Sequence, residues 1–193
     1  MDDRFSHIAP RSLHRPGVCK VLVVDDSAFN VKIMKNILKK VSTTWRCLSP
    51  VPTDTAADQG GVVQRLLQTD RSQAYMVSDT ISSPTITNGV SSSAVVLDLA
   101  DADDGAAALQ MVQAASEVGL PYDVVFMDNI MVVMHGPEAA QAMRAAGFRG
   151  LIVGVTGNVM PDDVRQYMGC GANHVLGKPV NIEDVKQILQ RLT

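Results

Sequence analysis

The chain has 193 residues, which is enough for one ordinary domain with additional loops and too few for two full domains. Its net charge is only -3 at pH 7, so composition indicates no broad attraction to nucleic acid or to a membrane surface. The cysteines Cys19, Cys47 and Cys170 share no spacing typical of metal ligands, which favours reduced thiols in a cytoplasmic or nuclear protein. The first residues lack the apolar segment of a signal peptide, and no direct membrane contact is expected.

The N-terminal part begins with a polar, proline-containing lead at residues 1–17, which we expect to be a disordered arm. An apolar run predicts a strand at about 19–25. The next helix begins after Asp26 or Ser27 and ends near Thr43. Several apolar residues recur in it at helical spacing and are expected to share its buried side: Phe29, Ile33, Met34, Ile37, Leu38 and Val41.

Residues 44–93 are rich in Ser, Thr, Asp, Gly and Pro, and we expect them to be a low-complexity insertion that interrupts a domain at 18–193. Only residues 61–67 favour a short helix. Two roles stay open for the segment: a disordered spacer, or a regulatory or docking element.

Regular structure resumes after the insertion. Further strands are predicted at 94–99, 123–127, 151–155 and 174–177, and the helices that follow them begin near Asp104, Pro137, Pro161 and Asn181. Five repeats of a strand followed by a helix predict an α/β fold, a doubly wound parallel sheet with helices on both faces.

Polar side chains stand where the apolar strands end. Asp25 and Asp26 follow the first strand, Asp128 the third, Thr156 the fourth and Lys178 the fifth. In an open parallel sheet, ligands bind at the carboxyl edge. Three carboxylates, a hydroxyl and an ammonium at that edge indicate a site for a divalent cation and a phosphoryl group, although each residue alone has a simpler reading, such as helix capping by Asp26.

Taken together, these segments resemble the receiver domain of two-component response regulators, most closely the receiver modules of hybrid histidine kinases. The resemblance covers roughly residues 18–193 with the insertion excised. It implies a flavodoxin-like sheet with strand order 2-1-3-4-5. The matching segments are Val-Leu-Val-Val-Asp-Asp-Ser at 21–27, Asp-Gly at 104–105, Phe-Met-Asp-Asn-Ile-Met at 126–131, Met-His-Gly at 134–136, Val-Thr-Gly-Asn at 155–158 and Gly-Lys-Pro at 177–179.

The resemblance implies a role for each site residue. Asp128 is expected to be the phosphoacceptor, Thr156 the switch hydroxyl and Lys178 the cation that pairs with Asp128 and then with its phosphate. A Mg²⁺ ion would be held by Asp26 directly, by Asp25 through water, by Asp128 and by the backbone carbonyl of Ile130. The Lys178–Pro179 bond is a candidate cis peptide.

The function implied by this resemblance is that of a phosphorelay receiver. A histidine kinase or a histidine phosphotransfer protein would donate a phosphoryl group to Asp128, and the chain would catalyse only its own phosphorylation and dephosphorylation. We expect a stand-alone receiver or the cytosolic end of a hybrid histidine kinase. The fourth helix, fifth strand and fifth helix are expected to form the responsive surface, and a homodimer through the same surface is considered as well.

Two departures from the family pattern keep other functions open. Val132 stands where a proline is usual, and Val175 where an aromatic residue is common. A receiver that had lost its phosphate dependence would be a pure interaction domain. A phosphatase of the haloacid-dehalogenase type would need a second aspartate two residues after Asp128, where Ile130 stands.

Overall fold

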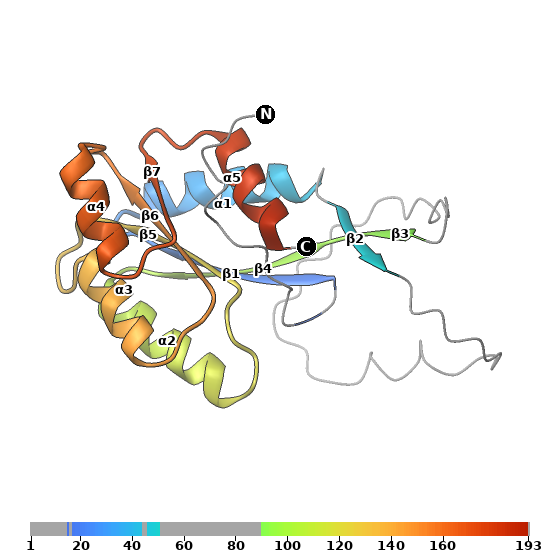
Figure 1. Ribbon diagram of the computed structural model, residues 1–193, viewed down its shortest axis with the longest axis horizontal. Coiled ribbons are helices and arrows are strands. Elements are labelled where there is room, and N and C mark those ends of the chain that lie inside the picture. The colour runs from blue at the N-terminus through green and yellow to red at the C-terminus, as the bar shows by residue number, and fades with distance from the viewer. Residues whose placement is uncertain (1–14, 16, 44–45, 51–89, 193) are drawn as a thin grey trace. The chain divides into compact units, whose positions relative to one another are not determined.

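The computed structural model describes residues 15, 17–43, 46–50 and 90–192, and its main element is a five-stranded parallel sheet (Figure 1). The strands lie in the order β4-β1-β5-β6-β7. Their bounds are β1 Val18–Val24, β4 Val96–Ala102, β5 Val124–Asp128, β6 Leu151–Thr156 and β7 His174–Gly177. Counted along the chain without the two strands of the insertion, this is the predicted order 2-1-3-4-5, so the expected fold is confirmed.

Helices cover both faces of the sheet (Figure 1). The core residues of α1 and α5 cluster on one face, and those of α2, α3 and α4 cluster on the other. The bounds of the helices are α1 Ala28–Ser42, α2 Gly105–Glu117, α3 Gly136–Ala145, α4 Pro161–Gly169 and α5 Ile182–Leu189, which a 3₁₀ turn at Gln190–Leu192 follows. The starts of all five agree with the sequence prediction to within a residue or two.

The central strands β1, β5 and β6 are buried on both sides, which explains their continuous apolar runs. In β1, Val21 and Val23 contribute to the core beneath α1 and α5, whereas Leu22 and Val24 contribute to the core beneath α2 and α3. Successive side chains of a strand point to opposite faces, so a strand covered on both faces has no solvent-facing positions. Polar side chains are therefore concentrated at the strand ends.

The prediction for the buried side of α1 was partly wrong. Met34, Ile37, Leu38 and Val41 are buried, but Phe29 is 70% exposed. Ile33 is 43% exposed. Residues four apart in a helix are rotated by about 40° relative to each other, so a row at that spacing drifts around the axis. Ile37 faces the sheet and is buried. Because of this rotation, Ile33, one turn earlier, faces the sheet less directly, and Phe29, two turns earlier, points to solvent.

The insertion contains strands at its two ends that the sequence analysis missed. β2 (Arg46–Pro50) and β3 (Val90–Ala94) pair with each other in a separate two-stranded sheet. The predicted short helix at 61–67 and residues 1–14 of the predicted arm lie outside the described residues. The chain divides into two compact units, residues 1–47 with 93–193 and residues 48–92.

The second strand of the main sheet is also shifted from its prediction. β4 begins at Val96 and continues to Ala102, in parallel register with the whole of β1 from Val18 to Val24. β4 is an edge strand with several exposed positions. Its ends therefore could not be predicted accurately from the positions of apolar residues. Within the described part of the chain, no helix combines the length and the apolar character that a membrane crossing requires.

Candidate functional site

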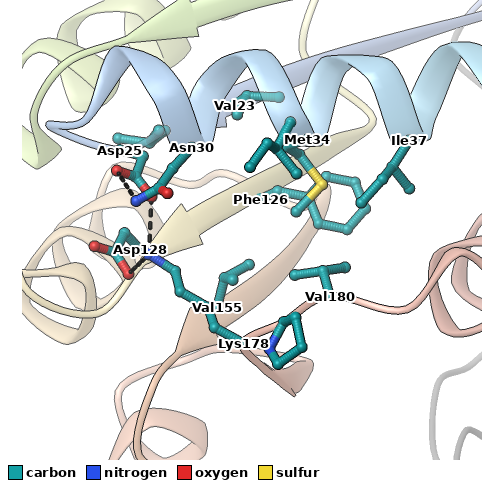
Figure 2. Close-up of a pocket in the computed structure, with 13 residues that line it drawn as sticks. Val23, Asp25, Asn30, Met34, Ile37, Phe126, Asp128, Val155, Lys178 and Val180 are labelled. Carbon is teal, nitrogen blue, oxygen red and sulfur yellow. Dashed lines mark hydrogen bonds and ion pairs between the residues drawn. The ribbon is translucent and has the colours of Figure 1, made fainter.

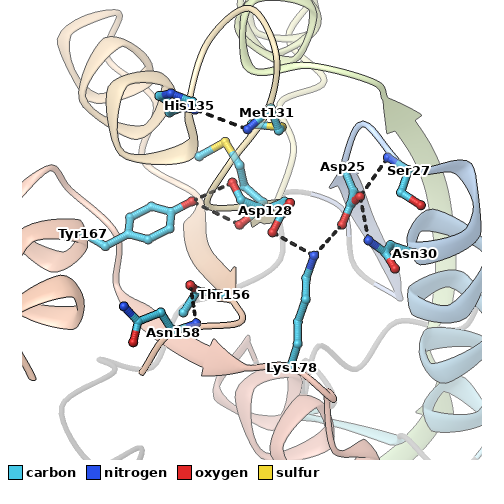
Figure 3. Close-up of polar contacts among 11 residues, drawn as sticks. Asp25, Ser27, Asn30, Asp128, Met131, His135, Thr156, Asn158, Tyr167 and Lys178 are labelled. Atoms are coloured by element: carbon cyan, nitrogen blue, oxygen red, sulfur yellow. Dashed lines mark hydrogen bonds and ion pairs between the residues drawn. The ribbon is translucent and has the colours of Figure 1, made fainter. Parts of the chain in front are cut away.

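The polar residues predicted to meet at the carboxyl edge of the sheet do lie together there (Figure 3). Asp25 directly follows β1, Asp128 ends β5, Thr156 ends β6 and Lys178 directly follows β7. Carboxylate oxygens of Asp25, Asp26 and Asp128 all lie within 4.8 Å of one another. The parallel pairing of β1 with β5, from Val21 opposite Val124 to Val24 opposite Met127, brings these carboxylates side by side.

Lys178 bridges two of the carboxylates. Its Nζ lies 2.8 Å from Oδ1 of Asp128 and 3.0 Å from Oδ2 of Asp25. Burial acts to lower the pKa of Lys178, but the hydrogen bonds and charges of the two carboxylates outweigh it, and the pKa lies above its usual value. The Lys178 ammonium therefore keeps its positive charge at neutral pH and lies between the two carboxylates. The Lys178–Pro179 peptide is cis, as expected.

Asp25 is held firmly in place. It is 7% exposed, and besides Lys178 it accepts a hydrogen bond from the backbone N–H of Ser27 at 2.9 Å and one from Nδ2 of Asn30 at 3.0 Å. Asn30 lies in the first turn of α1, so the helix and the strand-end carboxylate orient each other. Asn30 was not predicted as a site residue, although its position one turn after the Asp-Asp pair was a usable signal.

The environment of Asp128 disfavours the ionised form of its carboxyl group. Burial raises its pKa above the usual value, and the charge of Asp25 adds to this, while Lys178 acts in the opposite direction without cancelling it. A raised pKa means that the ionised form is disfavoured relative to water. A divalent cation among the three carboxylates would supply the positive charge that is missing.

Two further predicted site residues, Thr156 and Ile130, lie at the end of β6 and in the loop after β5. Thr156 is buried, and its Oγ1 accepts a hydrogen bond from the backbone N–H of Asn158 at 3.1 Å. Its hydroxyl proton can still be donated to another group, because a hydroxyl both donates and accepts. Ile130 lies in the loop after β5 with its side chain 70% exposed, so only its backbone carbonyl is suited to a metal. That contribution stays a prediction.

Asp104 does more than cap the helix that was predicted to begin near it. Its Oδ1 accepts from the N–H of Ala106 at 2.7 Å, the expected cap of α2. Its Oδ2 accepts from the N–H groups of Val133 and Met134, at 2.9 and 3.1 Å, and so ties down the loop between β5 and α3. On the other side of this loop, Nδ1 of His135 accepts from the N–H of Met131 at 3.3 Å. The loop is thus held in place without a proline at position 132.

Replacing Asp104 by alanine is expected to lower the free energy of unfolding by about 1–3 kcal/mol, because one helix cap and two partly buried hydrogen bonds to the N–H groups of Val133 and Met134 are lost together. Burial alone would raise the pKa of Asp104, but the backbone N–H groups outweigh it and the net pKa is lowered. The contribution is therefore complete above the unfolded pKa of about 3.9 and is lost as the pH falls through the lower folded value.

Urea unfolding of wild type and Asp104→Ala between pH 7 and pH 2 would measure this. The exposed neighbour Asp103 provides the control, and Asp103→Ala should change the free energy of unfolding by less than about 0.5 kcal/mol. A gap between Asp104→Ala and wild type that stays constant down to pH 2 would contradict the role of the carboxylate.

An apolar cavity of ≈ 430 Å³ adjoins the cluster (Figure 2). Asp25, Asp128 and Lys178 form its polar end. The rest is lined mainly by apolar side chains of α1 and of the strands, including Met34 and Phe126. The charged cluster therefore lies at the end of a hollow that α1 covers.

Comparisons with known proteins agree with this geometry. The family model of the response regulator receiver domain matches residues 77–190. Two-component system protein A of Emericella nidulans is 28% identical over 141 residues, which cover 73% of this chain and 19% of that protein. Two-component response regulator ORR41 of Oryza sativa subsp. japonica is 36% identical over 91 residues, which cover 47% of this chain and 69% of that protein. The chain thus spans about a fifth of the first relative.

A solved structure shares the fold. The receiver domain of the histidine kinase CKI1 from Arabidopsis thaliana, complexed with Mg²⁺ and BeF₃⁻, superposes with a TM-score of 0.55 at 21% identity, over 90% of this chain and 89% of that one. The matched family segment does not include Asp25 and Asp26, which precede the insertion, but β1 returns them to the same sheet edge as Asp128. The chain belongs to the family of response regulator receiver domains.

Proposed function

We propose that this receiver takes up a phosphoryl group on Asp128, in a reaction that depends on Mg²⁺, and that a phosphohistidine is the donor. The observation that carries the proposal is the position of the Lys178 ammonium, 2.8 Å from Asp128 and 3.0 Å from Asp25, beside three carboxylates that could share a cation. Such a site neutralises an anionic nucleophile and an anionic phosphoryl group at the same place.

The reaction follows from these positions. An oxygen of Asp128 attacks phosphorus, the bond from phosphorus to the donor nitrogen breaks, and the leaving imidazole keeps the electron pair of that bond and takes up a proton. The product is an acyl phosphate on Asp128. Lys178 offsets the added negative charge, and the hydroxyl of Thr156 can donate a hydrogen bond to a phosphoryl oxygen.

A Mg²⁺ ion would be held by Asp25, Asp26, Asp128 and the carbonyl of Ile130. This donor set suits the ion, since Mg²⁺ prefers oxygen ligands and commonly binds one or two carboxylates together with phosphate. When bound, it would neutralise charge on the transferred group. The Arabidopsis receiver with Mg²⁺ supports this assignment by analogy of fold.

The partners that follow from this proposal are a histidine kinase or a histidine phosphotransfer protein, met in the cytoplasm or nucleus. A homodimer through α4, β7 and α5 stays a prediction. The interaction-domain alternative is disfavoured by the intact set of carboxylates, hydroxyl and ammonium. The phosphatase alternative lacks a general acid, because Ile130 has no titratable group.

The decisive experiment is the intact mass of the wild-type chain after treatment with acetyl phosphate, with Mg²⁺ or with a chelator. We expect one added phosphoryl group that requires Mg²⁺. Borohydride reduction and peptide mapping should then place it on Asp128. A folded protein that gains no group from acetyl phosphate or from a phosphohistidine donor would exclude the proposal and favour the interaction domain.

A further inference from the structure

Tyr167 is the only buried residue of α4. Its side chain is 2% exposed, whereas the other residues of this helix are exposed or half-buried. The ring of Tyr167 and the half-buried side chain of Met168 are the apolar groups of α4 that pack into the core on this face of the sheet. Neither capping nor helical periodicity pointed to Tyr167 in the sequence.

The hydroxyl of Tyr167 reaches the strand end that bears the phosphoacceptor (Figure 3). It donates to the carbonyl of Met127 at 3.0 Å and lies 3.4 Å from the carbonyl of Asp128. Burial, with a further contribution from the charge of Asp128, raises the pKa of Tyr167, so the hydroxyl keeps the proton that it donates. The hydroxyl proton of Tyr167 is thus shared between the carbonyl oxygens of Met127 and Asp128.

Two glycines make room for the ring. A Cβ atom at Gly154 in β6 would lie 2.5 Å from Cε1 of Tyr167. A Cβ atom at Gly136, where α3 begins, would collide with the Tyr167 hydroxyl and with the carbonyl oxygen of Asp128. The ring is therefore packed closely against β6 and the start of α3, and its hydroxyl lies beside the carbonyl of Asp128.

The start of α4 is tied to the site a second time. The N–H of Asn158 donates to Thr156, and Nδ2 of Asn158 donates to Asp163 in the first turn of α4 at 2.5 Å. A movement of Thr156 toward a phosphoryl group would therefore pull on the beginning of α4, while the Tyr167 hydroxyl holds the end of the helix to the peptide of Asp128. The helix has two connections to one reactive centre.

We propose that Tyr167 is a positioning residue whose hydroxyl couples the placement of α4 to the phosphorylation state of Asp128. The inference rests on the proposed phosphorylation of Asp128. Addition of a phosphoryl group changes the charge and the contacts of the β5 end, and the hydrogen bond from Tyr167 passes that change to α4. In this proposal the ring of Tyr167 packs α4 against the core, and its hydroxyl couples α4 to the end of β5.

The test compares Tyr167→Phe with Tyr122→Phe. Tyr122 is also a buried tyrosine of the same core cluster, but it lies just before β5, at the other end of that strand. Amide chemical shifts are recorded for both variants and for wild type, before and after acetyl phosphate with Mg²⁺, and intact mass confirms the phosphoryl group in each sample. We expect Tyr167→Phe to take up the group and to lose the shift changes in the last turn of α4, around residue 167, while those at the start of α4 and next to Thr156 and Lys178 persist. Tyr122→Phe should behave as wild type.

The outcomes separate the two proposals. Equal α4 responses in Tyr167→Phe and wild type, with the phosphoryl group present in both, would overturn the role of the hydroxyl and leave the proposed function intact. A wild type that gains no group would overturn both. A second measurement guards against a misfolded variant: in wild type labelled at tyrosine Cζ, the Tyr167 signal should shift on phosphorylation while the Tyr122 signal does not, and an unchanged Tyr167 signal would contradict the coupling.

Discussion

An Asp128→Asn protein is expected to gain no phosphoryl group from acetyl phosphate and Mg²⁺, and to be at least as stable as wild type. The first result follows because an amide offers no anionic oxygen for attack on phosphorus. The second follows from the raised pKa of Asp128, which shows that burial and the charge of Asp25 disfavour its ionised form in the fold. Lys178 keeps its contact with Asp25, so no charge is left without a partner.

Intact mass and thermal unfolding, measured on the same preparations, would check both parts. Asp162→Asn is the matched control, because Asp162 is an exposed carboxylate in the first turn of α4 and should change neither quantity appreciably. Phosphorylation of Asp128→Asn at the wild-type rate would place the acceptor elsewhere. A large loss of stability in Asp128→Asn would mean that the ionised carboxylate stabilises the fold, which would contradict the inference from its raised pKa.

A Lys178→Met protein is expected to be phosphorylated on the order of 10²-fold more slowly or worse, the effect typical of removing one charge-stabilising group from a reaction centre. The change also leaves Asp25 and Asp128 facing each other without their shared cation. Mg²⁺ should then bind more tightly and stabilise the variant more than it stabilises wild type, because it relieves that repulsion. The affinity for Mg²⁺ would therefore rise while the rate of phosphorylation falls.

Calorimetric Mg²⁺ titration and a time course of intact mass would measure the two effects. Lys186→Met, which removes a cation paired with Glu183 in α5, controls for the loss of one positive charge. If Lys178→Met bound Mg²⁺ more weakly than wild type, or kept the wild-type rate, the assigned role of the ammonium would be wrong.

The convergence of the site residues could be predicted because it depends on local patterns alone. Asp25, Asp128 and Lys178 each stand at the end of an apolar run, and parallel strands place such ends at one edge. The second set of contacts made by Asp104 could not be predicted in this way. Its cap of α2 is local, but Val133 and Met134 follow it by 29 and 30 residues and meet it only because the loop after β5 folds back onto β4 and α2.

The sequence by itself determined the alternation of strands and helices in the main sheet domain, the doubly wound class of the fold and the chemical character of the sheet edge. These properties follow from periodicity, capping and strand ends, which act over a few residues. The tertiary structure alone decided that Lys178 also contacts Asp25, that Phe29 is exposed and that Tyr167 binds the backbone beside Asp128. The reason is that the reach of a side chain beyond its own element depends on how helices and strands pack, which no local pattern specifies.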